Sequence, residues 1–196
     1  MIRISDLLLT VSLEVGARWI EPNAAVEQPI LVSISIFHDV SPAAQTDDLS
    51  LSLNYFVIAN DIKNATQTKS FSGLRDVSRH ISNVLSDTLA NFLDGLEVHI
   101  KVVQLRSPLH TKTVGIEHIA NFQSDRSWVP SQITHFVEDL SCPAIIGVNP
   151  QERIEKQDVM VNLAIESEGH GLDGEAIDLR VVTKTLYDVS DFSHFT

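Results

Sequence analysis

The sequence contains a single cysteine, Cys142, among its 196 residues. One thiol can form neither an internal disulfide nor a cysteine-based metal site, which is typical of a protein in a reducing compartment. No apolar run approaches the roughly 20 residues that a membrane-spanning helix requires, and the N-terminal residues alternate between apolar and polar, as in a strand rather than a signal peptide. We therefore expect a cytoplasmic protein that does not bind a membrane.

Positive charge is also scarce. Fourteen Lys and Arg residues face 26 Asp and Glu residues, for a formal net charge of -12. Nucleic-acid binding requires a clustered basic surface, so this class of partner is excluded. The eight histidines show no paired ligand spacing, and no glycine-rich nucleotide or phosphate loop is present. We expect no bound metal and no cofactor.

What the chain does contain is an internal repeat. In residues 15–36 and 145–161, an alternating run ends at a glycine, a glutamate follows, and a glutamine precedes the next alternating run. The three markers are Gly16, Glu21 and Gln28 in the first segment and Gly147, Glu152 and Gln157 in the second. A repeat of this kind predicts two structural copies in one chain.

The first copy has the pattern of an α+β domain. Four stretches alternate with a period of two, which predicts half-buried strands, and two have the apolar spacing of helices. The strands are expected at 7–15, 29–38, 96–102 and 114–118, and the helices at 51–62 and 72–92. This order favours a four-stranded antiparallel sheet with two helices on one face, in a domain that covers residues 1–120.

The second copy is shorter. Residues 121–131 are predicted to be a linker, and alternating stretches then predict strands near 133–148 and 159–165. Residues 178–189 have helical spacing. Two strands and one helix match only the beginning of the first pattern. We therefore expect 132–196 to be a truncated second copy that packs loosely or uses another chain.

Several motifs, in this order, resemble the dihydroneopterin aldolase family. They are the glycine–glutamate–glutamine loop, the segment T-D-D-L-S-L-S-L-N-Y before the first helix, and the strand T-V-G-I-E-H-I. The second copy adds I-G-V-N-P-Q-E-R-I-E-K-Q. The tandem arrangement is similar to the N-terminal part of fungal multifunctional folate-synthesis proteins. The resemblance implies a tunnelling-type fold.

The resemblance also implies a reaction of folate biosynthesis. Family members cleave 7,8-dihydroneopterin by a retro-aldol step to 6-hydroxymethyl-7,8-dihydropterin and glycolaldehyde, with the dihydropterin ring as electron acceptor. A lysine and an ordered water move protons, a tyrosine helps to protonate the enol, and a glutamate anchors the pterin by accepting two parallel N–H bonds. Family members join their sheets into rings with pterin sites between subunits. This implies a homo-oligomer or an assembly with other folate-pathway domains.

Five residues are candidates for the site. Tyr55 matches the family tyrosine, although its spacing also fits an aromatic on a buried helix face. Glu21 matches the loop glutamate, although a solvated loop carboxylate is an equal alternative. We assign Glu21 and Tyr55 to catalysis. We assign Leu74, Asp76 and Glu152 to substrate binding, and no residue to a metal.

Two positions depart from the family pattern. Arg75 stands where the family has its anchoring glutamate, and a guanidinium has only donors, so it cannot accept the N–H bonds of a pterin. Asp76 could replace the glutamate only if the helix turned by about 100°. Gln104 or Leu105 stands where the family has its lysine. Arg106 is close by, but a guanidinium is a poor proton shuttle.

Two hypotheses follow. The first is an aldolase-like enzyme that shares its site with another copy, so that Tyr55 and Glu21 combine with the anchor and the lysine of that copy. The second is a non-catalytic pseudo-repeat that completes an oligomeric ring with an active aldolase copy. Arg75 and the missing lysine motivate the second hypothesis.

Overall fold

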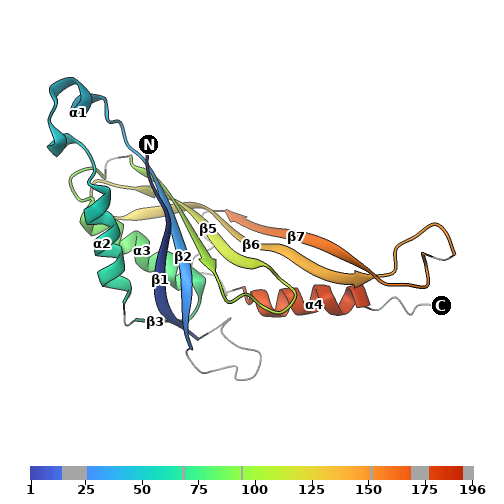
Figure 1. The fold of residues 1–196 in the computed structure, drawn as a ribbon. Coiled ribbons are helices and arrows are strands. Elements are labelled where there is room, and N and C mark those ends of the chain that lie inside the picture. Colours follow the sequence, from blue (N-terminus) through green and yellow to red (C-terminus); the bar gives the residue numbers. More distant parts are fainter. Residues whose placement is uncertain (15–25, 68, 94, 151, 169–176, 192–196) are drawn as a thin grey trace.

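A single sheet, antiparallel except for one short strand, runs through the described part of the chain (Figure 1). The computed structural model describes residues 1–14, 26–67, 69–93, 95–150, 152–168 and 177–191. Within these residues the seven strands lie in the order β3-β1-β2-β4-β5-β6-β7. The strands are β1 (Ile2–Leu13), β2 (Val26–Phe37), β3 (Ser70–Phe71), β4 (Glu97–Gln104), β5 (Thr113–Phe122), β6 (Trp128–Ala144) and β7 (Gln157–Glu168).

The helices α2, α3 and α4 lie on one face of this sheet (Figure 1). The described helices are α1 (Ser41–Thr46), the 3-10 turn η1 (Leu49–Leu51), α2 (Tyr55–Thr66), α3 (Leu74–Thr88) and α4 (Leu179–Asp191). Helix α2 begins at Tyr55 because the Asn54 side chain accepts hydrogen bonds from the backbone N–H groups of Phe56 and Val57. A turn at Gly95, whose φ of 68° suits glycine, leads from α3 into β4.

The α+β class is confirmed, but the predicted sheet of four strands is too small. Strands β1, β2, β4 and β5 are neighbours, as expected, and α2 and α3 cover them. However, the ladder continues from β5 into β6 and β7, and β3 adds a short parallel pair to β1. The stretch predicted as a linker, 121–131, forms the end of β5, a turn and the start of β6. The period of two could not reveal which sheet the later strands join.

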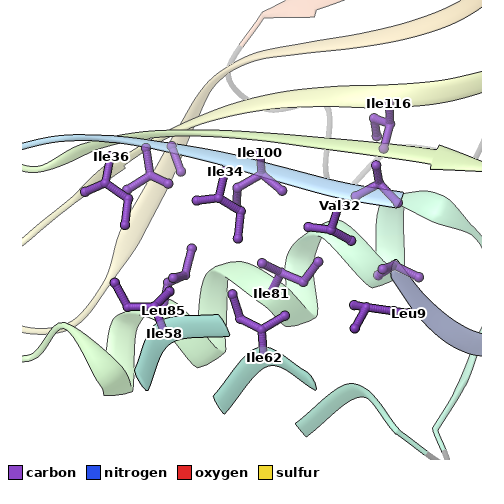
Figure 2. Packing of buried hydrophobic residues seen from close by; sticks show 14 of the residues in the cluster. Leu9, Val32, Ile34, Ile36, Ile58, Ile62, Ile81, Leu85, Ile100 and Ile116 are labelled. Carbon is purple, nitrogen blue, oxygen red and sulfur yellow. The ribbon is translucent and has the colours of Figure 1, made fainter. Parts of the chain in front are cut away.

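The main core lies between the sheet and the helices of the first copy. Ile34 and Ile100 on the sheet face Ile58 of α2 and Ile81 of α3 (Figure 2), and all four side chains are buried. Burial of a side chain of this size contributes roughly 1.5–3 kcal/mol. A second, smaller cluster lies under α4. It contains Val114, Val137, Leu140, Cys142 and Leu179.

The two copies repeat an irregular feature of the strand pairing. In β1 the register against β2 shifts between Ile4 and Leu7, and Asp6 adopts a left-handed φ of 53°. In β6 the register against β7 shifts between Val137 and Leu140, and Asp139 has a φ of 51°. In each case two residues oppose one, which is a β-bulge.

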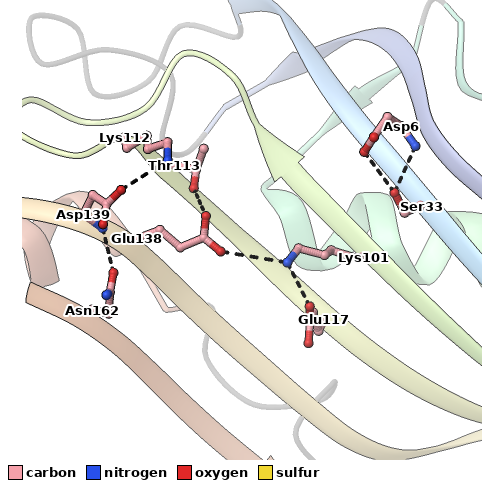
Figure 3. Close-up of polar contacts among 9 residues, drawn as sticks. All are labelled: Asp6, Ser33, Lys101, Lys112, Thr113, Glu117, Glu138, Asp139 and Asn162. Atoms are coloured by element: carbon pink, nitrogen blue, oxygen red, sulfur yellow. Dashed lines mark hydrogen bonds and ion pairs between the residues drawn. The ribbon is translucent and has the colours of Figure 1, made fainter.

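The two bulges are held in the same way (Figure 3). The backbone N–H of Asp6 donates to the Ser33 hydroxyl on β2 at 3.0 Å. The backbone N–H of Asp139 donates to the Asn162 side-chain oxygen on β7 at 2.8 Å. The shared bulge aligns Asp6 with Asp139 and Ser33 with Asn162, which supports the correspondence of β6 and β7 to β1 and β2.

Gly115 allows β5 and β6 to come together closely. It lies directly opposite Phe136, and a Cβ at this position would collide with the Phe136 ring and with the Val102 carbonyl oxygen. The Lys101 ammonium lies 4.5 Å from the centre of the same ring. The strand motif T-V-G-I-E-H-I therefore needs its glycine for the contact between the copies.

Candidate functional site

Tyr55 is the first residue of α2 and is 65% exposed. The apolar stripe of α2 is formed instead by Ile58 and Ile62, which are buried in the main core. The alternative of a buried aromatic on the helix face is therefore excluded for the free chain. Tyr55 is available to a molecule outside this copy.

Leu74 and Asp76 lie in the first turn of α3. The Leu74 side chain packs partly against the main core. The Asp76 carboxylate accepts hydrogen bonds from the backbone N–H of Ser72 at 3.3 Å and from its hydroxyl at 2.8 Å. Asp76 thus holds the start of α3, and its carboxylate is already engaged.

Tyr55 does not meet Leu74 and Asp76 within the first copy, because α2 and α3 pack antiparallel. The His80 ring in the middle of α3 contacts the Ala65 carbonyl near the end of α2, at 3.0 Å. Thr88, the last residue of α3, donates to Asp61 in the middle of α2 at 2.9 Å. Tyr55 and Ala65 are ten residues apart, about 15 Å along a helix. A site that needs the tyrosine beside the start of α3 must therefore take them from different copies.

Helix α4 of the second copy begins at a cap like that of α2. Asp178 caps α4 as Asn54 caps α2, because its carboxylate accepts the Arg180 backbone N–H at 2.9 Å. The same carboxylate binds the Arg180 guanidinium at 2.7 Å. Aligning the two caps places Leu179 at the position of Tyr55. Leu179 is 8% exposed and packs against Val114 of β5.

We call the contact between β5 and β6, with the first turn of α4, the in-chain joint. Gln104 lies directly opposite Val114 in the ladder. The positive charge of Arg75 acts on His135 of β6, which is paired with Ile116. Arg75, Gln104 and Leu179 therefore lie at or beside this joint, and the roles that the resemblance suggests for their positions remain predictions.

Gln104 is also engaged in the turn that follows β4. Its side-chain nitrogen donates to the Arg106 carbonyl at 2.7 Å, and the side chain is buried. Gln28, the third marker of the repeat, is also buried. It lies two residues before Ile30, which pairs with Gln104 in the sheet. Among the described residues, neither polar atom of the Gln28 amide has a hydrogen-bond partner. Two uncharged amides are therefore buried close together, at the start of β2 and the end of β4.

Two buried histidines lie on the helix-facing side of the in-chain joint. His118 of β5 contacts the Ser78 hydroxyl on α3 through Nδ1 at 3.0 Å. Burial lowers the pKa of His118 from 6.5 to about 4. Burial, aided by the Arg75 charge, lowers the pKa of His135 from 6.5 to about 4. Both rings are therefore neutral near pH 7.

Glu152 lies in the loop between β6 and β7, away from the in-chain joint. Ala144, the end of β6, is seven residues beyond Val137, about 23 Å along a strand. The Glu152 carboxylate accepts the backbone N–H groups of Val148 and Asn149, each at 3.1 Å. These bonds and the Asn149 side chain lower its pKa below the usual 4.5. A Cβ on Gly147 would collide with Glu152, so the paired glycine and glutamate shape this loop.

Glu21, the other catalytic candidate, lies outside the described residues. The pterin-binding and catalytic assignments made from the sequence therefore remain predictions. The sequence reasoning missed Leu179 and His135. The signal for Leu179 was available, because Asp178 and Asn54 are both capping residues before an apolar helix. His135 could not be found, since its position is set by the register of β6 on β5.

Two further observations concern the described part of the chain. No group of three or more His, Cys, Asp or Glu side chains there could hold a metal ion. Nor does that part contain a helix with the length and apolar character needed to cross a membrane.

Comparisons with known proteins identify relatives of the first copy. The profile of the dihydroneopterin aldolase family (FolB) matches residues 20–119. The folic acid synthesis protein fol1 of Pneumocystis carinii is 28% identical over 138 residues. That alignment covers 70% of this chain and 18% of the relative, so the chain spans less than a fifth of its length.

A solved structure shows the same fold. A Vibrio cholerae protein assigned as a dihydroneopterin aldolase (FolB) has a TM-score of 0.50 at 16% identity, over 60% of this chain and 93% of that one. The E. coli dihydroneopterin aldolase in complex with neopterin has a TM-score of 0.48 at 23% identity, over 60% and 96% of the two chains. The matched profile covers half of the sequence. The chain belongs to the dihydroneopterin aldolase family.

Proposed function

We propose that this chain takes part in the retro-aldol cleavage of 7,8-dihydroneopterin by supplying Tyr55 to a site that another aldolase copy completes. The products are 6-hydroxymethyl-7,8-dihydropterin and glycolaldehyde. The observation that carries the proposal is the position of Tyr55, exposed at the start of α2 and separated by the antiparallel helix pair from the first turn of its own α3.

The chemistry divides between the two sides of such a site. A base removes the proton of the side-chain hydroxyl, the carbon–carbon bond breaks, and glycolaldehyde leaves. The electron pair passes into the dihydropterin ring and returns to carbon when the enol is protonated. The tyrosine side supports this protonation, and the other copy supplies the carboxylate anchor and the lysine.

The in-chain joint does not provide these groups. Arg75 offers donors where a pterin also offers donors, which leaves buried polar groups unpaired. Leu179 has no hydroxyl and fills its place with apolar contacts. Gln104 has no ionisable group. This joint therefore connects the copies, and the reaction belongs to the outer side of the chain.

The experiment that tests the proposal is a chain whose second copy is complete. The residues H-F-T at the end of the sequence match S-F-S at 70–72, so residues 73–122 can be appended after Thr196. The appended segment carries glutamate at the position of Arg75 and lysine at that of Gln104. We expect this two-copy chain to cleave dihydroneopterin, measured by product fluorescence.

Tyr55→Phe in the two-copy chain tests the role of the hydroxyl. We expect it to lower kcat by about 10²–10⁴-fold, the usual range for a general acid or base. Tyr187→Phe is the matched control, because Tyr187 stacks on His110 away from the proposed site, with ring centres 4.1 Å apart. Turnover that survives Tyr55→Phe, or no turnover in a folded two-copy chain that binds neopterin, contradicts the proposal.

A second candidate function is a non-catalytic copy that completes an assembly around an active aldolase. The substitution of all three positions at the in-chain joint favours it. The two functions differ in one result. If the assembly forms and the active copies keep full turnover with Tyr55→Phe, the chain is a scaffold.

A further inference from the structure

We propose that a hollow on the face of the sheet opposite the helices binds a small polyhydroxylated molecule that carries one anionic group. Its volume is about 360 Å³, at the lower end of the roughly 300–1,000 Å³ of small-molecule sites. This sheet hollow is lined by side chains of β1, β2, β4, β5 and β6, among them Arg3, Ser35, His99, Lys101, Glu117 and Thr134. The inference goes beyond the proposed function and does not depend on it, because Tyr55 does not line the hollow.

The side chains of the sheet hollow point away from the helices. In β2, Ser33 and Ser35 flank Ile34, which is buried in the main core under the helices. In β4, Lys101 precedes Val102, which is buried in the same core. Successive side chains of a strand point to opposite faces of the sheet. The polar residues therefore gather on the face that α2 and α3 leave uncovered.

The bulge of β1 brings two charged residues onto this face. In a regular strand Arg3 and Asp6 would point to opposite faces, because they are an odd number of residues apart. The register shift between Ile4 and Leu7 adds one residue, and both charged side chains line the sheet hollow. The Asp6 carboxylate is engaged there, since it accepts a hydrogen bond from the Ser33 hydroxyl at 3.3 Å.

Arg3 and Ser35 supply a place for the anionic group. They lie directly opposite each other in the sheet, and His99 lies opposite Ser35 on its other side. Neighbouring strands are about 4.8 Å apart, so the three residues form a row about 10 Å long. Within the described residues, neither the Arg3 guanidinium nor the Ser35 hydroxyl has a hydrogen-bond or ion-pair partner. A guanidinium with free N–H groups binds a carboxylate or a phosphate through paired hydrogen bonds.

Lys101, the other cation of the sheet hollow, is already neutralised. Its ammonium lies 3.0 Å from a carboxylate oxygen of Glu117 and 4.0 Å from one of Glu138 (Figure 3). Arg3 is thus the cation that remains available to a ligand. A chain with a net charge of -12 repels anions, and salt screens charges that are more than about 10 Å apart. An anion must therefore be held by direct contact with this guanidinium.

The next row of the sheet hollow suits hydroxyl groups. Glu117 lies opposite Thr134 in the sheet, and the Gln132 side-chain nitrogen donates to the Thr134 hydroxyl at 3.4 Å. Acceptors and donors thus alternate along this row. A hydroxyl group can donate one hydrogen bond and accept two, so it matches such a lining better than a pure donor or a pure acceptor does.

The second copy keeps the bulge but lacks both open groups. The counterpart of Arg3 is Phe136, and that of Ser35 is Ala164, which lies opposite Phe136 as Ser35 lies opposite Arg3. The Phe136 ring is 8% exposed and lies under the Lys101 ammonium. The strand framework thus accepts an apolar pair at this place. Arg3 and Ser35 are not required by the fold, which leaves ligand binding as their role.

The lining also argues against a planar aromatic ligand. Among the described residues that line the sheet hollow, none is Phe, Tyr or Trp, so a pterin would find no such ring on which to stack. Half-buried Ile119 provides a small apolar wall for carbon atoms. The ligand class is therefore a sugar acid or a sugar phosphate.

An NMR titration of the full chain tests the inference without any enzymatic readout. The probes are gluconate, which has a carboxylate, and ribose 5-phosphate, which has a phosphate. At least one of them should bind saturably with a Kd of about 1 mM or below, and should shift the amides of Ser35, Lys101 and Thr134. The tighter probe identifies the anionic group. Ribose and inorganic phosphate, each with only one part of the ligand, should bind at least about tenfold more weakly.

Two arginine variants decide whether the correct cation is used. Arg3→Gln should weaken binding of the tighter probe by about tenfold or more, as for loss of a hydrogen bond to a charged group. Arg126→Gln is the matched control, because its side chain is 62% exposed and does not line the sheet hollow. It should leave the Kd within about twofold. Both residues are exposed, and circular dichroism checks that both variants fold.

Two further variants should move the affinity in opposite directions. Ser35→Ala should weaken binding by about three- to tenfold, and the alanine is tolerated at the same place in the second copy. Glu117→Gln should strengthen binding by about two- to fivefold, because it removes a negative charge and releases Lys101 from its ion pair.

The inference is overturned if neither gluconate nor ribose 5-phosphate binds at about 10 mM, or if the two arginine variants lose affinity equally. Inorganic phosphate that binds as tightly as the better probe would reduce the site to a general anion site. Weaker binding in Glu117→Gln would show that the ligand is attracted by negative charge, which contradicts the proposed class. Because dihydroneopterin cleavage is not measured, these outcomes are distinct from failure of the proposed function.

Discussion

The two edges of the first copy present matching surfaces, one of which is covered and one exposed. At the in-chain joint, β6 lies on β5, and Leu179 and Val137 are buried. At the outer face, formed by β1 and the first turn of α2, Tyr55 is exposed and Ile4 is partly exposed. The backbone framework is shared, down to the left-handed Asp6 and Asp139. The difference lies in which side chains occupy the matching positions and in whether a neighbouring strand covers them.

The comparison assigns different roles to the two surfaces. The in-chain joint connects the copies, and the exposed surface carries the residue proposed for catalysis. At the positions compared with the family pattern, the covered joint has an apolar side chain (Leu179), an amide (Gln104) and a guanidinium (Arg75). The open face keeps a tyrosine, which is useful only when a partner completes the site. A joint that never opens gains stability from apolar packing, whereas a site that binds substrate must keep polar groups that are unpaired when empty.

The largest contrast is expected from truncating the two counterparts at the helix start. Leu179→Ala should lower the free energy of unfolding by about 2–4 kcal/mol, since it removes a buried leucine and leaves a cavity. Tyr55→Ala should change it by no more than about 0.5 kcal/mol, because the ring is exposed. Chemical denaturation of both variants measures the contrast. Equal losses would show that the two positions are equally covered in solution.

Acid should destabilise the in-chain joint, where both buried histidines lie. The pKa values of His118 and His135 are lowered to about 4 in the folded chain, against 6.5 without burial. Between these values the unfolded chain binds protons that the folded chain excludes. The contribution of each neutral ring to the free energy of unfolding is therefore fully present above pH 6.5. It is lost as the pH drops toward 4, by on the order of 2–3 kcal/mol for each ring.

His135→Val tests the assignment of this acid sensitivity. Its counterpart on the outer face is Ile2, so an apolar residue suits the position. The variant should lose about half of the pH dependence in denaturation curves. The matched control is His99→Gln, at a half-exposed position, and should retain it all. Unchanged pH dependence in His135→Val would remove this histidine from the explanation.

Gly115→Ala should loosen the contact between the copies. The added methyl group meets the Phe136 ring and a backbone oxygen, and overpacking of this kind costs about 1–3 kcal/mol. Thermal unfolding would detect the loss. Combining it with Phe136→Ala should restore part of the stability, because the ring that collides is removed. If the double variant loses as much stability as the two single variants added together, the collision is not the cause.

The smallest effect is expected at the bulges. Asn162→Ala removes the acceptor of the Asp139 backbone N–H, and Ser33→Ala removes that of Asp6. Asn162→Ala should cost about 1 kcal/mol, as for a single neutral hydrogen bond. Ser33→Ala should cost somewhat more, because the Ser33 hydroxyl also donates to the Asp6 carboxylate at 3.3 Å. Amide hydrogen exchange at Asp139 and Asp6 measures the local change. A protected amide in the alanine variant would mean that another group holds the bulge.

The strands and helices of the first copy could be predicted because their periodicity is local. The start of α2 was missed by a few residues, since apolar spacing alone does not reveal that Asn54 caps the helix and a 3-10 turn precedes it. Strand β6 runs through Pro143, because this part of the strand extends past the pairing with β5, and a proline is tolerated at such an edge.

The candidate site was only partly accessible from the sequence. Tyr55 and Arg75 could be located by motif, and both lie at the helix starts where the motifs place them. Which of them share a site depends on the antiparallel packing of α2 and α3 and on the register of β6 against β5. Those are long-range contacts that no spacing rule contains. The burial of Leu179 follows from them as well.

The glycine opposite Phe136 also has a consequence for the order of synthesis. Strand β5 leaves the ribosome before β6, so for a time its edge is open to strands from other chains. The place above Gly115 accepts the flat Phe136 ring, whereas the corresponding residue of a foreign β1 is the charged, flexible Arg3. Pairing with β6 therefore places an aromatic ring above Gly115, whereas pairing with a foreign β1 in the same register would place a charged side chain there.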